Sequence, residues 1–137
     1  MINTVKRTIY ITNADMIRLR SLVASAKNGR DDLDSLRNEL HHAHVVEPED
    51  IPADVITMNS KARLRDLDTG EEMVFTVVFP GQASIEHDRI SVVAPIGTAM
   101  LGHRVGDEFE WQVPAGLVRL RVEKVLYQPE AAGHYHL

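Results

Sequence analysis

The sequence contains no cysteine among its 137 residues. This absence excludes disulfide bonds, thiolate nucleophiles and cysteine-ligated zinc sites, and it suits a reducing cytosol. No apolar run approaches the roughly 18 residues of a membrane-spanning helix. The opening residues, MINTVKRTIYITNAD, lack the apolar core and the cleavage site of an export signal. We therefore expect a cytoplasmic protein with no membrane partner.

Motifs of common enzyme classes are also missing. The chain has no phosphate loop of the Gly-x-x-x-x-Gly-Lys-Ser/Thr type and no nucleophile elbow. We expect no enzyme, no catalytic residue, no cofactor and no metal site.

The charge is acidic overall but unevenly distributed. A net charge of −5 argues against a general nucleic-acid binder, because neutralising phosphates requires clustered positive charge. Residues 1–30 carry a balance of +5, residues 31–60 carry −7 and the remainder carries −3. This asymmetry favours a protein partner with its own charge pattern. Two helices docked basic against acidic would explain it equally well.

Residues 1–44 are predicted to form a short antiparallel helical hairpin. Thr12 is a good N-cap, and Asp15 follows at the spacing of a capping box. Two apolar series, each with spacings of three, four and three, flank a turn at residues 27–30. The series are Met16, Leu19, Val23 and Ala26, then Leu33, Leu36, Leu40 and Ala43. At 1.5 Å per residue, helices of about 13 residues protrude only ~20 Å.

Residues 45–55, VVEPEDIPADV, are predicted to be a linker, because they combine two prolines with four acids. From residue 56 to residue 137 the pattern changes to that of strands, with one short helix that begins at Pro95 and stops at Gly102. The expected strands cover residues 60–67, 73–79, 90–93, 109–113 and 118–122. Residues 73–79 are apolar on both faces and are expected to be central. The tail after Pro129 is expected to be loose. The predicted class is α+β, with an antiparallel sheet.

Three strings in this region carry a family resemblance. They are Ala94-Pro95-Ile96-Gly97-Thr98-Ala99-Met100-Leu101-Gly102, Val105-Gly106-Asp107 and Val113-Pro114-Ala115-Gly116. Their spacing resembles the C-terminal signature of the Gre factors, in which a serine-proline opens a short helix and a glycine-aspartate starts a strand. Met58-Asn59-Ser60, Thr69-Gly70-Glu71 and the opening Ile9-Tyr10-Ile11-Thr12 resemble the Rnk subfamily of that family. The similarity spans nearly the whole chain.

The resemblance implies an FKBP-like C-terminal domain that docks at the mouth of the secondary channel of RNA polymerase. Full-length Gre factors insert a long coiled coil, whose acidic tip helps to hold a second Mg²⁺ for cleavage of backtracked RNA. Such chemistry needs carboxylates within ångströms of the catalytic ion, and a hairpin of ~20 Å falls short. The resemblance therefore implies a regulator that competes with Gre factors without cleaving transcripts. An effect on nucleoside diphosphate kinase levels, for which the Rnk subfamily is named, would be regulatory.

The aspartate-serine-proline with which Gre factors contact the polymerase aligns with Val93, Ala94 and Pro95, so only the proline is retained. We expect polymerase contacts near the short helix, supported by basic residues of the helical hairpin. The expected contact residues are Pro95, Ile96, Met100, Leu101, Arg18, Arg20, Lys27 and Arg30. We interpret the basic residues of the hairpin, together with Lys6 and Arg7, as a solvated helix face or as a patch for an acidic polymerase surface. Nucleic acid is expected to be contacted at most indirectly, since only Tyr10 lies nearby for base stacking.

Three further groups have both structural and functional interpretations. Asp31, Asp32 and Asp34 at the hairpin tip are read as helix caps, with a Gre-type cleavage role as the alternative. His41, His42 and His44, with His134 and His136 in the tail, are read as partners of helix-terminal carbonyls, with metal binding as a weak alternative. The aromatic residues are read as core, with the pocket of a prolyl isomerase or peptide-binding module as the alternative. They are Phe75, Phe79, Phe109, Trp111 and Tyr127.

Overall fold

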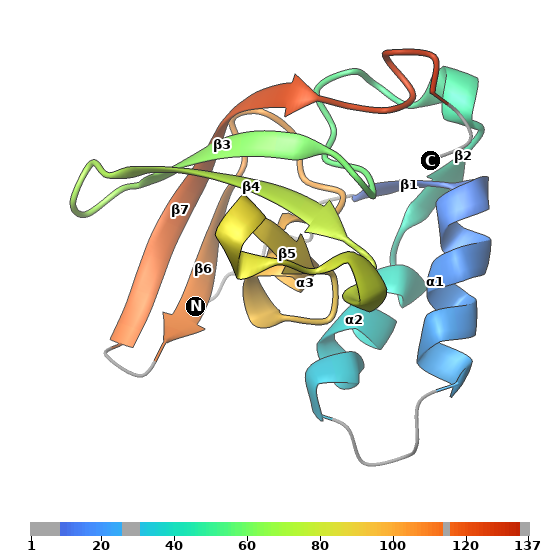
Figure 1. The fold of residues 1–137 in the computed structure, drawn as a ribbon, viewed down its shortest axis with the longest axis horizontal. Coiled ribbons are helices and arrows are strands. Elements are labelled where there is room, and N and C mark those ends of the chain that lie inside the picture. Colours follow the sequence, from blue (N-terminus) through green and yellow to red (C-terminus); the bar gives the residue numbers. More distant parts are fainter. Residues whose placement is uncertain (1–8, 26–30, 114–115, 135–137) are drawn as a thin grey trace.

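The computed structural model describes residues 9–25, 31–113 and 116–134. Two helices, α1 (Asn13–Ser25) and α2 (Asp31–His41), contact each other beside a five-stranded sheet (Figure 1). The α+β class is therefore confirmed. The predicted turn at residues 27–30 and Ala26 lie outside the described residues, as does the side chain of Leu33. Within the described part of the chain, no helix combines the length and hydropathy needed to cross a membrane.

The sheet consists of strands that the sequence predicts within one or two residues at most ends. They are β3 (Lys61–Asp66), β4 (Glu72–Val78), β5 (Arg89–Ser91), β6 (Glu108–Val113) and β7 (Gly116–Tyr127). Their order is β5-β4-β3-β7-β6. β3 is the middle strand. β4, which was expected to be central, is an interior strand with β5 on one side and β3 on the other.

The prediction of a wholly antiparallel sheet is wrong in one place, because β5 runs parallel to β4. Two 3-10 turns, η2 (Pro80–Gln82) and η3 (Ile85–His87), lie between these strands. They carry the chain back so that it re-enters the sheet in the same direction. A parallel pair requires such a crossover, whereas a tight hairpin would have made the pair antiparallel.

The segment expected to be a linker begins as a strand. β2 (His44–Val46) pairs in parallel with β1 (Tyr10–Thr12), and the His44 N–H donates to the carbonyl of Ile9 at 2.8 Å. α1 and α2 lie between the two strands in sequence and return the chain to the side of β1 (Figure 1). A 3-10 turn, η1 (Pro48–Asp50), follows.

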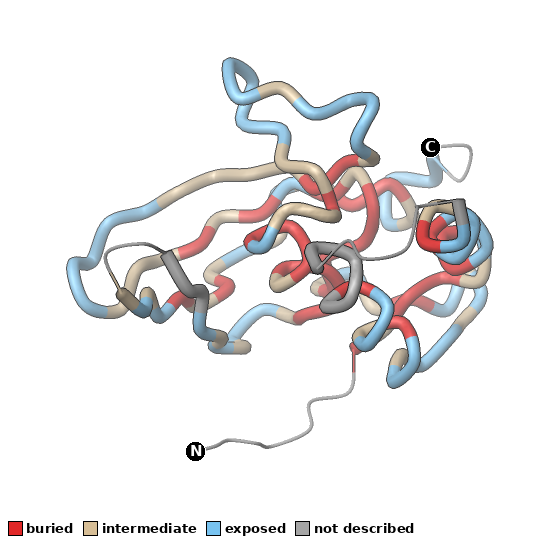
Figure 2. Tube along the Cα trace, turned by 90° about the horizontal axis from the view of Figure 1, so that it is seen from below, coloured by how far each residue is buried: buried red, intermediate tan, exposed pale blue. Residues whose placement is uncertain are grey.

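One hydrophobic core joins the helices to the sheet. Its buried residues come from both the helices and the strands, and Figure 2 marks them in red along the chain. The helices contribute Met16, Leu19, Val23, Leu36 and Leu40, and the rest of the chain contributes Ile56, Leu64, Val77, Leu120 and Val122, among others. The helices are therefore held against the sheet by burial of apolar surface, not by the connection at residues 45–55 alone.

The third helix, α3 (Pro95–Met100), contacts α2 and β6. It begins at Pro95 as predicted, since the fixed φ of proline suits the first helical position and its missing N–H costs nothing there. Gly97 lets the helix approach the end of β5: a Cβ at this position would lie 2.1 Å from the Ser91 carbonyl oxygen. Gly102 has a φ of +83° and packs against Ile9, so the chain can leave α3 in a turn that other residues rarely adopt.

Candidate functional site

Two parallel strands end side by side at one end of the sheet. Val78 of β4 pairs with Ser91 of β5, and the Val92 N–H donates to the Val78 carbonyl at 2.8 Å. Beyond this pair the chain presents Phe79 and Pro80 from β4, and residues 93–95 from β5. Phe79 and Val93 are partly buried against the core, whereas Pro80 and Pro95 are exposed. We call residues 79–80 and 93–95 the strand-end surface.

Hydrogen bonds around Ser91 hold the turn that leads into α3. The Ser91 carbonyl accepts from the Ala94 N–H at 3.0 Å, and the Ser91 hydroxyl accepts from the Val93 N–H at 3.2 Å. The Thr98 hydroxyl donates back to the Val92 carbonyl at 2.6 Å. With Gly97 packed on the same carbonyl of Ser91, the position of Pro95 is fixed by the backbone around it.

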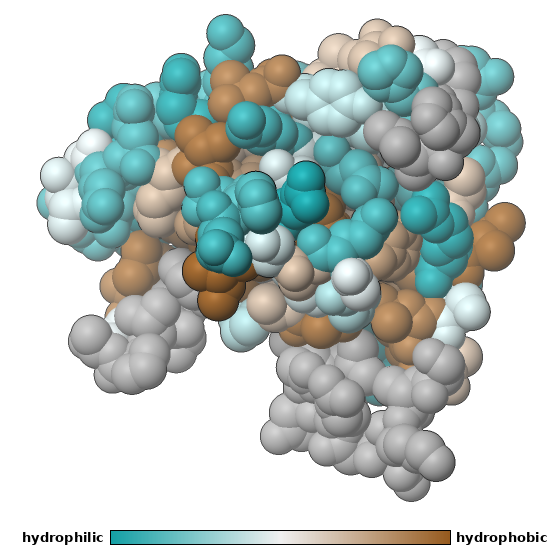
Figure 3. Space-filling view, viewed as in Figure 1, coloured by the Kyte–Doolittle hydropathy of each residue, from teal (hydrophilic) through white to brown (hydrophobic). Residues whose placement is uncertain are grey.

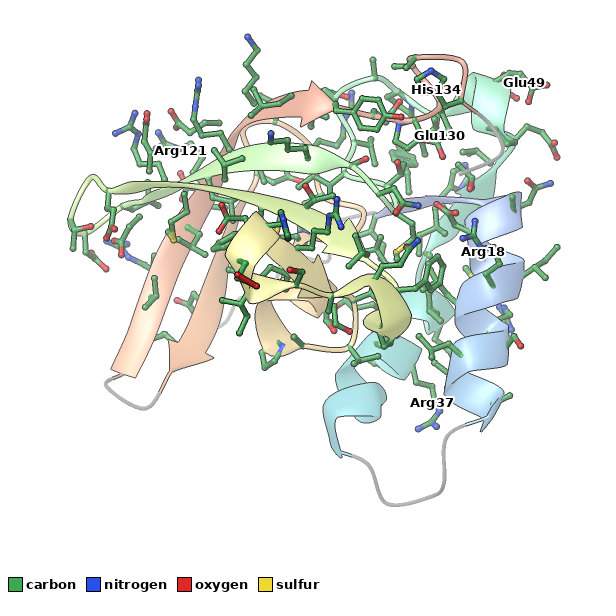
Figure 4. The ribbon with its side chains drawn as sticks, in the orientation of Figure 1. Arg18, Arg37, Glu49, Arg121, Glu130 and His134 are labelled. Atoms are coloured by element: carbon green, nitrogen blue, oxygen red, sulfur yellow. The ribbon has the colours of Figure 1, made fainter. Side chains whose placement is uncertain are left out.

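Arg18 extends from α1 to the strand-end surface. Its guanidinium carbon lies 4.5 Å from the centroid of the Phe79 ring, and its Nη1 lies 3.9 Å from the Asp15 carboxylate. Figure 4 shows Arg18 on the side of α1 that faces the sheet. The side chain is 44% exposed, so the cation also remains accessible to a partner. A cation over an aromatic ring contributes about 0.5–1 kcal/mol at such a site.

Of the expected contact residues on α3, only Pro95 is exposed. Ile96, Met100 and Leu101 belong to the core, with exposed fractions of 4%, 0% and 1%. A six-residue helix that lies on the sheet buries its apolar side chains to cover the core, as Ile96 and Met100 do here, and Leu101, directly after the helix, is buried with them. The expectation that Ile96, Met100 and Leu101 contact the polymerase is therefore wrong for their side chains. Of the residues expected on α3, Pro95 stays a predicted polymerase contact.

The basic residues of the hairpin differ in their surroundings. Arg20 is exposed and has no ion pair with any described residue. Lys27, Arg30, Lys6 and Arg7 lie outside the described residues. The tip acids stand on the first turn of α2, and their side chains are likewise not described. These acids are Asp31, Asp32 and Asp34. Their capping and cleavage roles stay predictions.

Asp15 joins α1 to two other segments. Thr12 caps the helix as predicted, because its hydroxyl accepts from the Asp15 N–H at 3.1 Å. The Asp15 carboxylate accepts instead from the Met58 N–H at 3.3 Å and is only 3% exposed. Burial, with a smaller contribution from the charge of Glu130, raises the pKa of Asp15 to about 6, against the lowering effects of its hydrogen bonds and of Arg18. Capping spacing was the only signal in the sequence for this residue.

The tail after Pro129 was expected to be loose, and up to residue 134 this is wrong. The Gln128 amide donates to the carbonyls of Pro52 and Val55, at 2.8 Å in each case. The Thr57 hydroxyl donates to the Glu130 carboxylate at 2.7 Å. These contacts are long-range in sequence, between 73 and 76 residues apart, so no local pattern could have indicated them.

The histidines do not converge. His42 Nδ1 lies 2.9 Å from the Asn38 carbonyl, at the end of α2, which is the kind of contact expected for this group. His44 stands on β2 with its ring 5.4 Å from that of Tyr10, and His134 contacts the Tyr127 hydroxyl. Among the described residues, no group of three or more potential ligands could hold a metal ion. His136 lies outside them.

The aromatic residues are spread over the core. Phe75, Phe79 and Phe109 are partly buried and pack against it, and the Phe109 ring stacks on His103 at 5.2 Å. Tyr127 is half-buried at the end of β7, while the side chain of Trp111 is not described. The structural interpretation of Phe75, Phe79 and Phe109 as core residues is thus supported.

The family of the chain follows from its match to known sequences. Residues 51–127 match the family described as transcription elongation factor, GreA/GreB, C-term, and residues 7–46 match the Rnk N-terminus. The chain belongs to the GreA/GreB family. Its N-terminal match identifies the Rnk branch, so the resemblance inferred from the sequence motifs is confirmed.

Individual members of the GreA/GreB family are similar over most of the chain. A protein named regulator of nucleoside diphosphate kinase from Escherichia coli is 42% identical over 132 residues, covering 95% of this chain and 97% of its own. A transcription elongation factor GreA from Syntrophotalea carbinolica is 35% identical over 67% of this chain and 58% of its own. A solved GreA/GreB structure from Nitrosomonas europaea has a TM-score of 0.77 at 40% identity and covers 89% of this chain.

Proposed function

We propose that this GreA/GreB-family protein is a cytoplasmic transcription regulator that binds RNA polymerase near its secondary channel. It competes there with Gre factors and does not cleave transcripts. The observation that carries the proposal is the strand-end surface. It contains the exposed Pro95, which aligns with the proline of the Gre contact motif, beside Phe79 and the accessible cation of Arg18.

The chemistry of the surface suits a protein partner. Half-buried Phe79 and Val93 offer apolar contact area, while Arg18 offers a charge that is already positioned by the ring beneath it. Protein interfaces are enriched in aromatic residues and arginine, and these residue types often contribute most of the binding free energy. Arg20, two residues along α1, is also exposed, but it lies on the opposite flank of the helix from Arg18.

The length of the helices supports the absence of transcript cleavage. α1 has 13 residues and α2 has 11, which at 1.5 Å per residue gives a reach of roughly 20 Å. The similarity to GreA covers 58% of that protein, so a large part of GreA has no counterpart in the match. A short pair of helices cannot deliver carboxylates to a distant catalytic ion, and two-metal hydrolysis requires them in direct contact with it.

The name of the Escherichia coli relative leads us to propose that the protein regulates nucleoside diphosphate kinase levels. The sequence has no phosphate-binding loop for direct action on a nucleotide. We therefore assign the effect to transcription, through competition for the polymerase.

The test is displacement of a labelled Gre factor from core RNA polymerase by the purified protein, followed by a cleavage assay on stalled elongation complexes. We expect displacement and no shortening of the transcript. Failure to displace the Gre factor would overturn the proposed site. Displacement with transcript shortening would instead assign the cleavage role to Asp31, Asp32 or Asp34, and alanine variants of these three would then identify the acid responsible.

A further inference from the structure

The outer face of the five-stranded sheet is basic, although the chain is acidic overall. Ala62 and Leu64 of β3 point into the core, so their neighbours in sequence and the strand partners of these neighbours lie on the outer face. The basic residues on this face are Lys61, Arg63, Arg65, Arg89, Arg119, Arg121 and Lys124. The acidic residues are Glu72, Glu108, Glu110 and Glu123. Figure 4 shows Arg121 on the side of the sheet away from α3.

At the end of the sheet near the turn between β3 and β4, the cations are paired. Arg65 contacts Glu72 and Glu123, Arg121 contacts Glu108 and Glu123, and Arg119 contacts Asp68 at 2.9 Å. These ion pairs neutralise that end of the face. They leave no excess positive charge there for an acidic partner.

Towards the other end of the sheet the acids are missing. Lys124, Arg63 and Val74 form one cross-strand row, and Tyr127, Lys61, Thr76 and Arg89 form the next. Neither row contains a carboxylate. With strands about 4.8 Å apart and alternate residues about 7 Å apart, the four cations lie within roughly 15 Å. None of them has an ion pair with a described residue. We call Lys61, Arg63, Lys124 and Arg89 the cationic band.

Two observations distinguish the cationic band from a set of freely solvated side chains. The Nε atom of Arg63 is buried without a hydrogen-bond partner among the described residues, so the surrounding packing holds this guanidinium in place. Apolar side chains are mixed with the cations: Val74 is half-buried, and Leu126 follows Lys124 on the same face with 41% of its area exposed. In Figure 3, the region over β3 and β7 shows hydrophilic residues with hydrophobic ones between them.

We propose that the cationic band is a docking site for an acidic segment of a partner protein. Charge complementarity selects an acidic partner, and the interleaved Val74 and Leu126 suit a polypeptide that carries apolar side chains among its acids. The two rows contain a single aromatic residue, Tyr127 opposite Lys61, whose hydroxyl lies 2.7 Å from His134 Nδ1, so they offer no series of rings on which successive bases could stack. The net charge of −5 also repels a nucleic acid at long range. The proposal does not depend on the polymerase site, because the band lies across the sheet from α3.

The experiment measures binding of the full-length protein to a labelled peptide of glutamate, serine and valine residues by fluorescence anisotropy. The test variant is Lys61→Glu/Lys124→Glu, in which both substituted side chains are exposed. The control is Arg119→Glu, on the same face but already paired with Asp68. We expect the double variant to weaken binding by about tenfold or more and the control by less than about twofold. Leu126→Ala should weaken binding by about threefold, because the band also offers apolar contact.

Three results would overturn the proposal. The first is no binding of the peptide at low ionic strength. The second is equal weakening by the control variant, which would show that only the overall charge matters. The third is tighter binding of a single-stranded RNA of matched charge, which would assign the band to nucleic acid. Circular dichroism of each variant, compared with the wild type, establishes that the fold is intact.

Discussion

The guanidinium carbon of Arg18 lies 4.5 Å from the centroid of the Phe79 ring and joins the first helix to the end of β4. The same side chain approaches the buried carboxylate of Asp15. Arg18 is therefore both a structural residue and a candidate contact for the polymerase. A variant at this position must be interpreted through both roles.

The two roles can be separated by comparing Arg18 with Arg20. Arg18→Gln should lower the free energy of unfolding by about 0.5–1 kcal/mol, because it removes a cation from an aromatic ring. Arg20→Glu should leave the free energy of unfolding within about 0.5 kcal/mol of the wild type, since this exposed residue has no ion pair with a described residue. If Arg20 contributes to docking, its charge reversal weakens polymerase binding all the same. Urea unfolding and a binding titration measure the two effects; unchanged polymerase affinity would remove Arg20 from the proposed interface.

Pro95→Glu tests the strand-end surface directly. Glutamate is well tolerated in the first turn of a helix, so we expect the fold to be kept. The charge placed on the docking surface should weaken polymerase binding by about tenfold. Leu117→Glu serves as a matched control, because Leu117 is 52% exposed at the start of β7, away from the strand-end surface. Equal affinities for the two variants would contradict the assigned surface.

Gly97→Ala should destabilise the protein by about 2–3 kcal/mol. The added Cβ would lie 2.1 Å from the Ser91 carbonyl oxygen, and a backbone atom cannot yield without moving the end of β5. Gly81→Ala is the control, because a Cβ there meets no atom within 4 Å and the backbone is not left-handed. Denaturant unfolding of the two variants provides the comparison. Similar stability of both would show that the turn before α3 relaxes easily.

Asp15 should give the stability of the protein a defined pH dependence. Its pKa is about 6 in the folded state against an ordinary 3.8, so between these values the folded state binds more protons than the unfolded state. The stability contributed by this group is therefore present below about pH 4 and lost as the pH rises through 6. The loss amounts to about 3 kcal/mol at most, at 1.4 kcal/mol per pKa unit.

The isosteric variant Asp15→Asn isolates this contribution. Its amide oxygen can still accept from the Met58 N–H, but it does not ionise. The stability of the variant relative to the wild type should rise between pH 4 and pH 6 and then level off. Chemical denaturation across this range measures the difference, and parallel pH profiles of the two proteins would rule out the buried carboxylate as its source.

Much of the local structure could be predicted because its causes are local. The Thr12 hydroxyl caps α1 by accepting from the N–H of Asp15, only three residues further along the chain. Pro95 begins α3 because its φ is already helical. The strands β3, β4 and β6 follow from alternation and β-branched composition. The family motifs are also strings of neighbouring residues, so they were readable without a structure.

The candidate site was predicted less completely. The family motif at residues 94–102 identified the turn that leads into α3. It could not distinguish exposed Pro95 from buried Met100, since both stand on the same six-residue helix. Nor did it indicate that Arg18 lies over Phe79, two residues separated by most of a domain in sequence. Orientation relative to the core is a property of packing, not of the motif.

The sequence by itself determined the family, the elements and their caps, because periodicity and turn chemistry act over a few residues. Only the tertiary structure decided the parallel pairings β1–β2 and β4–β5, the burial of α3, the anchoring of the tail by Thr57 and the acid-free rows of the outer sheet face. Each of these depends on contacts between segments that are distant in sequence. Their free energy arises from shared burial and from strand register, and neither exists until the whole chain has folded.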